Sequence, residues 1–561
     1  MARAMYTLGG CLLTMVACVG FLALEVPESR GQEEVSNPRV VAEDTSPFPG
    51  GYKSVKACRL CHRGQIRELD PDQDKSFVLL NEPAIWLTDP HSKAFAFIDW
   101  SDSADPASAS PSQQLSREIC AKLGISDIHK AQQCLSCHAN WVAALDEPPP
   151  FYTAGVGCES CHGPSEAWEN EHKEPSWRAR SVAYKASKGM VDVRHPVQRA
   201  EQCFSCHIGN VEQGKHVTHE MFAAGHPPLP SIEIESFAKQ MPRHWRYLEE
   251  KIADSQKVAS PDNADEPPFK FFDAFIRENY LYLKSDGPPP IDHNQSAAAV
   301  VLGGVVALRE MTELTRDLAR PATDGSRAWP ELSVFDCTAC HHELRPANWR
   351  QTRNGEFRPG RPPMHAWPTA LVRLAILHIS DGREEYDRAL DDFNGRLSAL
   401  RAPFEATPFG DPPTLRKAST EFSQWLTDDL IGPVAAKPFD KLAVRRSRKL
   451  LVHIGSTESQ DYDSARQIAW ALRTLCCDLS GRQEIQDLFD ELNNDLRLDL
   501  PNTQGEFFQT ATPNAQPHKS VIPLTGSVPA ALAIEVLYDP AKFMKTMKEL
   551  QRQFGLMTVR N

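Results

Sequence analysis

The chain has 561 residues, of which 41% are hydrophobic and 24% charged, a balance that excludes a disordered chain and a bundle of membrane helices. Its formal net charge is −13 and it has no long run of Lys and Arg, so nucleic acid is not an expected partner. The length exceeds what one hydrophobic core usually holds, and we expect two or three domains.

The first segment of the chain has the layout of a secretory signal peptide. Arg3 precedes a mostly apolar stretch over residues 8–24, and a polar run follows at residues 28–34. We assign residues 1–31 to this signal peptide, and the absence of a distinct cleavage site leaves an uncleaved N-terminal membrane anchor open. Residues 32–57 form a predicted polar leader.

Most cysteines of the chain belong to one repeated pattern, Cys-x-x-Cys-His. It is the attachment motif of c-type haem, in which two thiols form thioethers with the haem and the adjacent His ligates the iron. The predicted haem-binding cysteines are Cys58, Cys61, Cys134, Cys137, Cys158, Cys161, Cys203, Cys206, Cys337 and Cys340. The predicted proximal ligands of iron are His62, His138, His162, His207 and His341.

Paired cysteines also build structural zinc sites, which are the competing interpretation of such motifs. Here the pairs are odd in number and each is followed directly by His. We therefore predict five covalently attached haem c groups with their iron. In prokaryotes this attachment takes place outside the cytoplasmic membrane, so we expect a periplasmic or otherwise extracytoplasmic protein.

The spacing of apolar residues predicts a mainly α fold. Residues 58–230 hold four motifs and are expected to form a tetrahaem domain of short helices and loops packed around haems. Residues 231–365 form a predicted helical segment with the fifth haem, in which residues 297–308 are a buried helix. Residues 366–561 form a predicted helical domain without haem. Its amphipathic segments are Thr369–Ile379, Glu384–Arg401, Leu415–Leu430, Lys441–His453, Ala465–Leu479, Ile485–Leu498 and Ala541–Phe554.

The sixth ligand of each iron separates an electron carrier from a catalyst, because iron with two axial His has no open position. The strongest candidates for distal ligands are His91, His172, His219 and His226. Weaker candidates are His129, His342 and His365. We expect ordinary structural or solvated roles for His195, His216, His244, His293, His378, His453 and His518.

Several of these residues resemble the cytochrome c554 family of multihaem cytochromes, which is related to the haem core of hydroxylamine oxidoreductase. The resemblance lies in Trp86 with His91, in residues 157–164 around the third motif, and in His219 with residues 224–228. It covers roughly residues 50–230 and implies electron transfer through closely packed, mostly bis-His haems. It also implies that the second haem, that of His138, lacks a distal ligand. The fifth motif and the long C-terminal region depart from the family pattern.

Three hypotheses for the function follow. The favoured one is a non-catalytic pentahaem cytochrome that transfers electrons between redox protein partners, neither of which the sequence names. The alternative is a multihaem oxidoreductase that acts on a small nitrogen or sulfur compound at an open haem, with that of His138 as the candidate. The third is an assembly subunit that forms a complex through its C-terminal helices.

Three further features have structural interpretations. Cys120 is expected to be a small buried residue, and Cys476 and Cys477 to be two helix-face cysteines rather than a vicinal disulfide. A basic cluster is expected to be a solvated helix face, with docking of an acidic redox partner as the alternative. Its members are Lys441, Arg445, Arg446, Arg448 and Lys449.

Overall fold

The computed structural model describes residues 51–62, 81–101, 109–140, 152–248, 250–251, 272–279, 293–321, 329–342, 360–479, 482–495 and 537–560. Helices make up the regular structure of these ranges, apart from two isolated β-bridges, Asn210–Lys215 and Phe335–Met364. The predicted mainly α fold is confirmed. The predicted signal peptide lies outside the described residues, and the domain boundaries predicted beyond residue 57 stay predictions.

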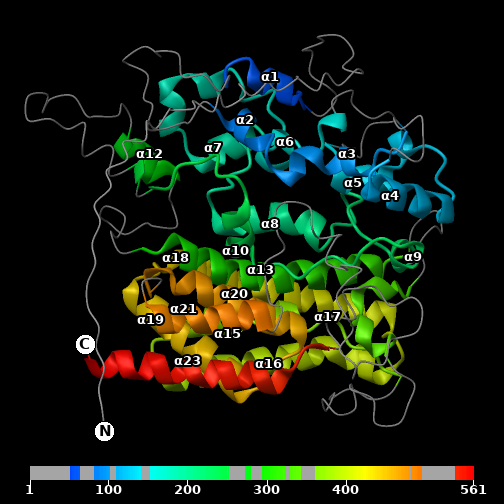
Figure 1. Ribbon diagram of the computed structural model, residues 1–561. Helices are drawn as coiled ribbons and strands as arrows, with labels where there is room; N and C mark the ends of the chain where they lie inside the picture. Colours follow the sequence, from blue (N-terminus) through cyan, green and yellow to red (C-terminus); the bar gives the residue numbers. More distant parts are fainter. Residues whose placement is uncertain are drawn as a thin grey trace, which may run out of the picture. The chain divides into compact units, whose positions relative to one another are not determined.

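Short helices carry the haem motifs in the N-terminal part of the chain (Figure 1). The first motif begins on α1 (Val55–Arg59), the second ends α5 (Gln132–His138) and the third forms α6 (Cys158–His162). The fourth ends α8 (Pro196–His207), and the fifth begins at η10 (Cys337–Ala339). A helical turn within the motif brings both thiols and the imidazole to one side of the chain.

The remaining elements of the motif-bearing part are also short, and the apolar clusters between them are small. One such cluster consists of Phe95, Leu135 and Ala139. The other elements are α2 (Glu82–Trp86), η1 (Pro90–Lys93), α3 (Ala94–Ile98), α4 (Pro111–Lys122), η3 (Ile128–Lys130), η4 (Tyr152–Ala154), η5 (Glu171–Lys173), η6 (Pro175–Ala179), α7 (Val182–Ser187), α9 (His219–Ala224), α10 (Ile234–Gln240), α12 (Phe272–Asn279) and η9 (Leu332–Val334).

Helix α13 (Gln295–Leu318) lies between α8, which carries the fourth motif, and the C-terminal helices (Figure 1). The predicted buried helix over residues 297–308 is confirmed, since every side chain in that range is buried. Gly304 is required by this packing, because a Cβ there would lie 2.6 Å from the Cβ of Leu371. A helix that is apolar on all faces is the expected centre of such a layered arrangement.

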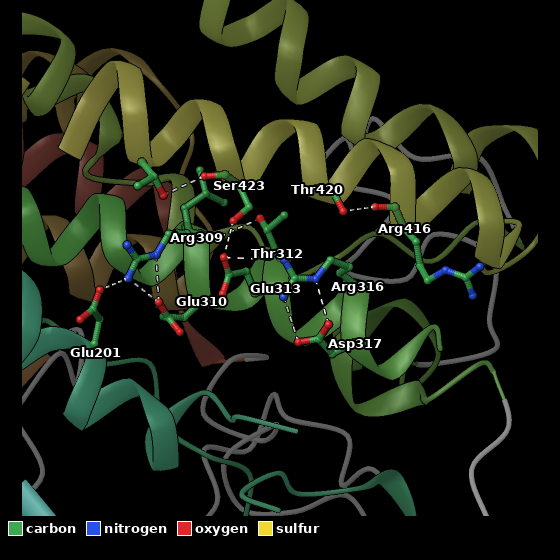
Figure 2. Close-up of polar contacts among 12 residues, drawn as sticks. Glu201, Arg309, Glu310, Thr312, Glu313, Arg316, Asp317, Arg416, Thr420 and Ser423 are labelled. Atoms are coloured by element: carbon green, nitrogen blue, oxygen red, sulfur yellow. Dashed lines mark hydrogen bonds and ion pairs between the residues drawn. The ribbon is translucent and has the colours of Figure 1, made fainter. Parts of the chain in front are cut away.

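Two polar links fasten α13 to its neighbours (Figure 2). Arg309 donates to Glu310 and to Glu201 of α8, two residues before the fourth motif. One turn further along α13, Glu313 accepts from Ser423 of α17. The helix that carries the fourth motif is therefore held to the central helix by a buried charge network as well as by apolar contacts.

Helices continue through the C-terminal part of the chain. They are η11 (Trp367–Thr369), α15 (Val372–Ile379), α16 (Arg383–Ala406), α17 (Pro412–Trp425), η12 (Leu426–Ile431), α18 (Gly432–Ala436), α19 (Lys441–Thr457), α20 (Tyr462–Leu475), η13 (Cys477–Leu479), α21 (Gln483–Asp490), η14 (Glu491–Asp495) and α23 (Pro540–Arg560). One continuous apolar core joins these helices to α13 and α8. Among the described helices, none combines the length and the apolar character needed to cross a membrane.

The smaller structural interpretations have mixed outcomes. Cys120 is buried as predicted, and Cys476 and Cys477 are separate thiols, the first buried and the second exposed. The basic cluster of α19 is only partly a solvated face. Arg446 donates to the carbonyls of Leu377 and Ser380, and Arg448 donates to that of Leu475. These two guanidinium groups satisfy carbonyls at helix ends, which the charge pattern alone did not indicate.

Candidate haem-binding sites

The imidazole of each motif histidine faces the imidazole of one other histidine. The separations of ring centroids are 6.3 Å for His62 and His172, 6.4 Å for His138 and His226, 6.5 Å for His162 and His244, 6.3 Å for His207 and His91, and 6.3 Å for His341 and His219. Five pairs from separate parts of the chain thus share nearly one spacing.

This spacing fits two ligands on opposite sides of one iron. An imidazole nitrogen binds a metal ion at about 2.0 Å, so two rings that ligate the same iron have centroids roughly 6 Å apart. Direct ring stacking is much closer, as His378 on Phe439 shows with centroids 3.6 Å apart. The residues present therefore fit a haem c between the two rings of each pair.

All four histidines expected as distal ligands face a motif histidine. His172 lies opposite His62 and His226 opposite His138. In the same way His91 lies opposite His207, and His219 opposite His341. The family resemblance implies no distal ligand at the second haem. In the structure, the ring of His226 lies opposite that of His138, the motif histidine of this site.

His244 is the residue that sequence reasoning missed. It was expected to be structural, yet its ring lies opposite that of His162, with the two planes 74° apart. It follows α10 in the segment Pro242-Arg243-His244-Trp245, which has no motif spacing that would mark a ligand. The signal that points to a further ligand is numerical: five motifs need five distal histidines for full bis-His ligation, and only four histidines are strong candidates from the sequence.

Other histidines have local partners instead. His129 lies 2.8 Å from Ser101 Oγ, and Nε2 of His365 lies 3.4 Å from the carbonyl oxygen of Ser333. His195 accepts from the backbone N–H of Val197 at the start of α8. His293 accepts from the N–H of Phe439, and His378 donates to the carbonyl of Lys437. His518 lies outside the described residues.

Hydrogen bonds at Nδ1 orient several of the paired rings. Glu82 Oε2 lies 2.7 Å from Nδ1 of His62, and Asp89 Oδ1 lies 2.8 Å from Nδ1 of His91. The other rings whose Nδ1 contacts are resolved hydrogen-bond to main-chain carbonyl oxygens. The acceptors are Ala94 for His138, Glu169 for His172, Pro227 for His226 and Pro242 for His244. An acceptor at Nδ1 holds the proton there and leaves Nε2 free for a metal.

The protonation states also suit metal binding. Burial lowers the pKa of His138, His162 and His207 to about 4, so these imidazoles are neutral at pH 7. Neutral imidazole is the form that binds a metal ion. The hydrogen bond that His62 donates to the Glu82 carboxylate raises the pKa of His62.

Thiols of different motifs lie beside each other. The Cys158 thiol of the third motif lowers the pKa of Cys58 in the first, and the Cys137 thiol of the second motif lowers the pKa of Cys206 in the fourth. The electrostatic influence of Cys203 and Cys206 also reaches Cys161, joining the third motif to the fourth. The attachment sites are therefore neighbours in space even where they are distant in the chain.

Comparison with known proteins agrees with this chemistry. The family model described as "Cytochrome c554 and c-prime" matches residues 57–163. A relative, "Cytochrome c-554" of Nitrosomonas europaea, is 23% identical over 234 residues, which are 40% of this chain and 83% of that protein. No solved structure gives a significant match. In its haem motifs and over residues 57–163, the chain is similar to the cytochrome c554 family of multihaem c-type cytochromes.

Proposed function

We propose that this protein is an extracytoplasmic pentahaem electron carrier in which all five irons have two axial histidines. The observation that carries the proposal is the set of five histidine pairs, each with one motif histidine and a separation of 6.3–6.5 Å. The thioether positions are the ten motif cysteines. Haem c supplies an iron that takes up and releases one electron, and the chain supplies its ligands and its surroundings.

The arrangement of attachment sites supports electron transfer within the protein. Thiols of the first and third motifs influence each other's pKa, as do those of the second and fourth, and thiols of the fourth motif raise the pKa of Cys161 in the third. The fifth motif is joined through α9, which begins at His219, the partner of His341, and ends just before His226, the partner of His138. The chain thus holds five sites in one contiguous series.

Paired axial histidines favour a carrier over an oxidoreductase. A histidine on each side of iron leaves no position for a small nitrogen or sulfur compound. His226 fills the position beside His138 on which the alternative function depended. We therefore propose redox proteins as the partners, and a location outside the cytoplasmic membrane because covalent haem attachment takes place there.

The test is to count the haems and determine their spin state. Mass spectrometry of protein exported by a host competent in cytochrome maturation should show the chain plus five haems. Electron paramagnetic resonance (EPR) of the oxidised protein should show low-spin iron only. A high-spin component that shifts on addition of nitrite, hydroxylamine or nitric oxide would instead support the oxidoreductase.

A further inference from the structure

Two of the five histidine pairs have a carboxylate behind one ring. Glu82 Oε2 lies 2.7 Å from Nδ1 of His62, the motif histidine of the first haem site. Asp89 Oδ1 lies 2.8 Å from Nδ1 of His91, the distal partner of His207 at the fourth site. The resolved Nδ1 partners at the second and third sites are neutral carbonyls, those of Ala94, Pro227 and Pro242.

A carboxylate acceptor changes the imidazole more than a carbonyl does. A hydrogen bond to an ionised acceptor is about twice as strong as a neutral one, and it draws the Nδ1 proton away from the ring. The ring then becomes a stronger electron donor to a metal at Nε2, which favours ferric over ferrous iron. The negative charge behind the ring acts in the same direction.

Both carboxylates are held in place by one short segment. Asp89 is 2% exposed and caps η1, where it also accepts from the backbone N–H of His91 at 2.9 Å. Glu82 lies in the first turn of α2, and helical hydrogen bonds run from α2 to Asp89 without a break. Trp86 fixes this segment by donating from Nε1 to the carbonyl of Val156 at 3.0 Å.

We infer that Glu82 and Asp89 are positioning residues that lower the reduction potentials of the first and fourth haems below the values these haems would have with neutral partners. The inference rests on the proposed bis-His ligation. It assigns to residues 82–89 the role of distinguishing two of the five haems from the rest.

The test is a potentiometric titration followed by EPR on the intact holoprotein and on E82Q and D89N. Both substitutions keep an oxygen acceptor and remove its charge. Each should raise the midpoint potential of one low-spin signal and leave the other signals unchanged.

The ring planes identify which signal should move. The planes of His62 and His172 are 3° apart, whereas those of His91 and His207 are 83° apart. Parallel imidazole planes split the iron orbitals strongly and give a rhombic spectrum, and perpendicular planes give a highly anisotropic one. E82Q should therefore shift a rhombic signal, and D89N a highly anisotropic one.

Asp127 offers a matched control. It caps η3 and accepts from the backbone N–H of His129 at 2.9 Å, the same Asp-x-His arrangement as at Asp89. The ring of His129, however, bonds to Ser101 and faces no motif histidine among its resolved contacts. D127N removes one charge and keeps the cap, so no haem potential should change appreciably.

The inference is overturned if the midpoint potentials in E82Q and D89N change no more than those in D127N, or if they become lower than in the wild-type protein. Should D89N fail to retain its haem, E82Q decides alone, because Glu82 is partly exposed and lies in the first turn of α2, whereas Asp89 is buried and caps η1. A wild-type protein without five low-spin irons contradicts the proposed function instead. The two failures are therefore distinguishable.

Discussion

The imidazole of His244 lies opposite that of His162, with ring centroids 6.5 Å apart. His162 ends α6 in the motif-bearing part, whereas His244 follows α10, beyond the domain boundary predicted at residue 230. The polypeptide on both sides of that boundary thus contributes to one haem site. Folding of the segment after residue 230 and ligation of the third haem are expected to be coupled.

Replacing His244 should open the third haem. In H244A, one low-spin signal should be replaced by a high-spin one, because iron would keep only His162 as a strong axial ligand. Added imidazole should restore the low-spin signal. H129A is the control, since the resolved contacts of the His129 ring are with Ser101, Asp99 and Phe95. An unchanged spectrum for H244A would exclude His244 as a ligand.

Loss of Arg309 should destabilise the junction between α8 and α13 (Figure 2). The Arg309 side chain is 9% exposed, and Glu310, to which it donates at 2.7 Å, is 11% exposed. R309A leaves Glu310 buried without its guanidinium, a change that typically costs about 3 kcal/mol or more. Thermal unfolding should show a clear fall in Tm.

R383A is the matched control for this network. Arg383 also pairs with a carboxylate, that of Asp387, but its side chain is 85% exposed. Solvent screens such a pair, so R383A should change the free energy of unfolding far less than R309A does. Equal effects of R309A and R383A would show that the buried network adds no stability.

Gly163 directly follows the third motif and has a φ of +79°, a conformation that side chains disfavour. A Cβ at this position would also overlap the carbonyl oxygen of Gly189. G163A should therefore lower both the stability and the occupancy of the third haem, as measured by thermal unfolding and by haem content per chain. Gly124 has a φ of +70° and open space around its Cβ position, so G124A should cost only the roughly 1 kcal/mol of backbone strain. A G163A protein as stable as G124A would refute the steric argument.

His378 should make the protein less stable in mild acid. Burial lowers the pKa of His378 to about 4, whereas the unfolded chain has the ordinary value of 6.5. Between these values the unfolded state binds more protons, so stability falls as pH decreases from 6.5 to about 4. The titration of His378 lowers the free energy of unfolding by at most about 3 kcal/mol over this pH range.

The comparison is with H378Q, whose amide can still donate to the carbonyl of Lys437 but does not titrate in this range. Chemical denaturation from pH 7 to pH 4 should give a shallower loss of stability for H378Q than for the wild-type chain. Parallel curves for the two proteins would contradict the prediction.

Local patterns made the helices of the C-terminal part predictable. The segments Glu384–Arg401 and Lys441–His453 lie within α16 (Arg383–Ala406) and α19 (Lys441–Thr457), because amphipathic periodicity is a property of neighbouring residues. The roles of Arg446 and Arg448 were not predictable in this way. Their acceptors are carbonyls of α15, of the turn after it and of α20, which only the packing brings close.

The sequence by itself determined the predicted positions of haem attachment, because two thiols and the proximal imidazole lie within five consecutive residues and need no tertiary contact to be recognised. The tertiary structure decided which histidine stands on the far side of each proximal ring. His244 and His226 come opposite His162 and His138 only when distant segments pack together. The acceptors at Nδ1 of the paired rings, among them Glu82 for His62 and Asp89 for His91, depend on side-chain placement that no spacing in the chain encodes.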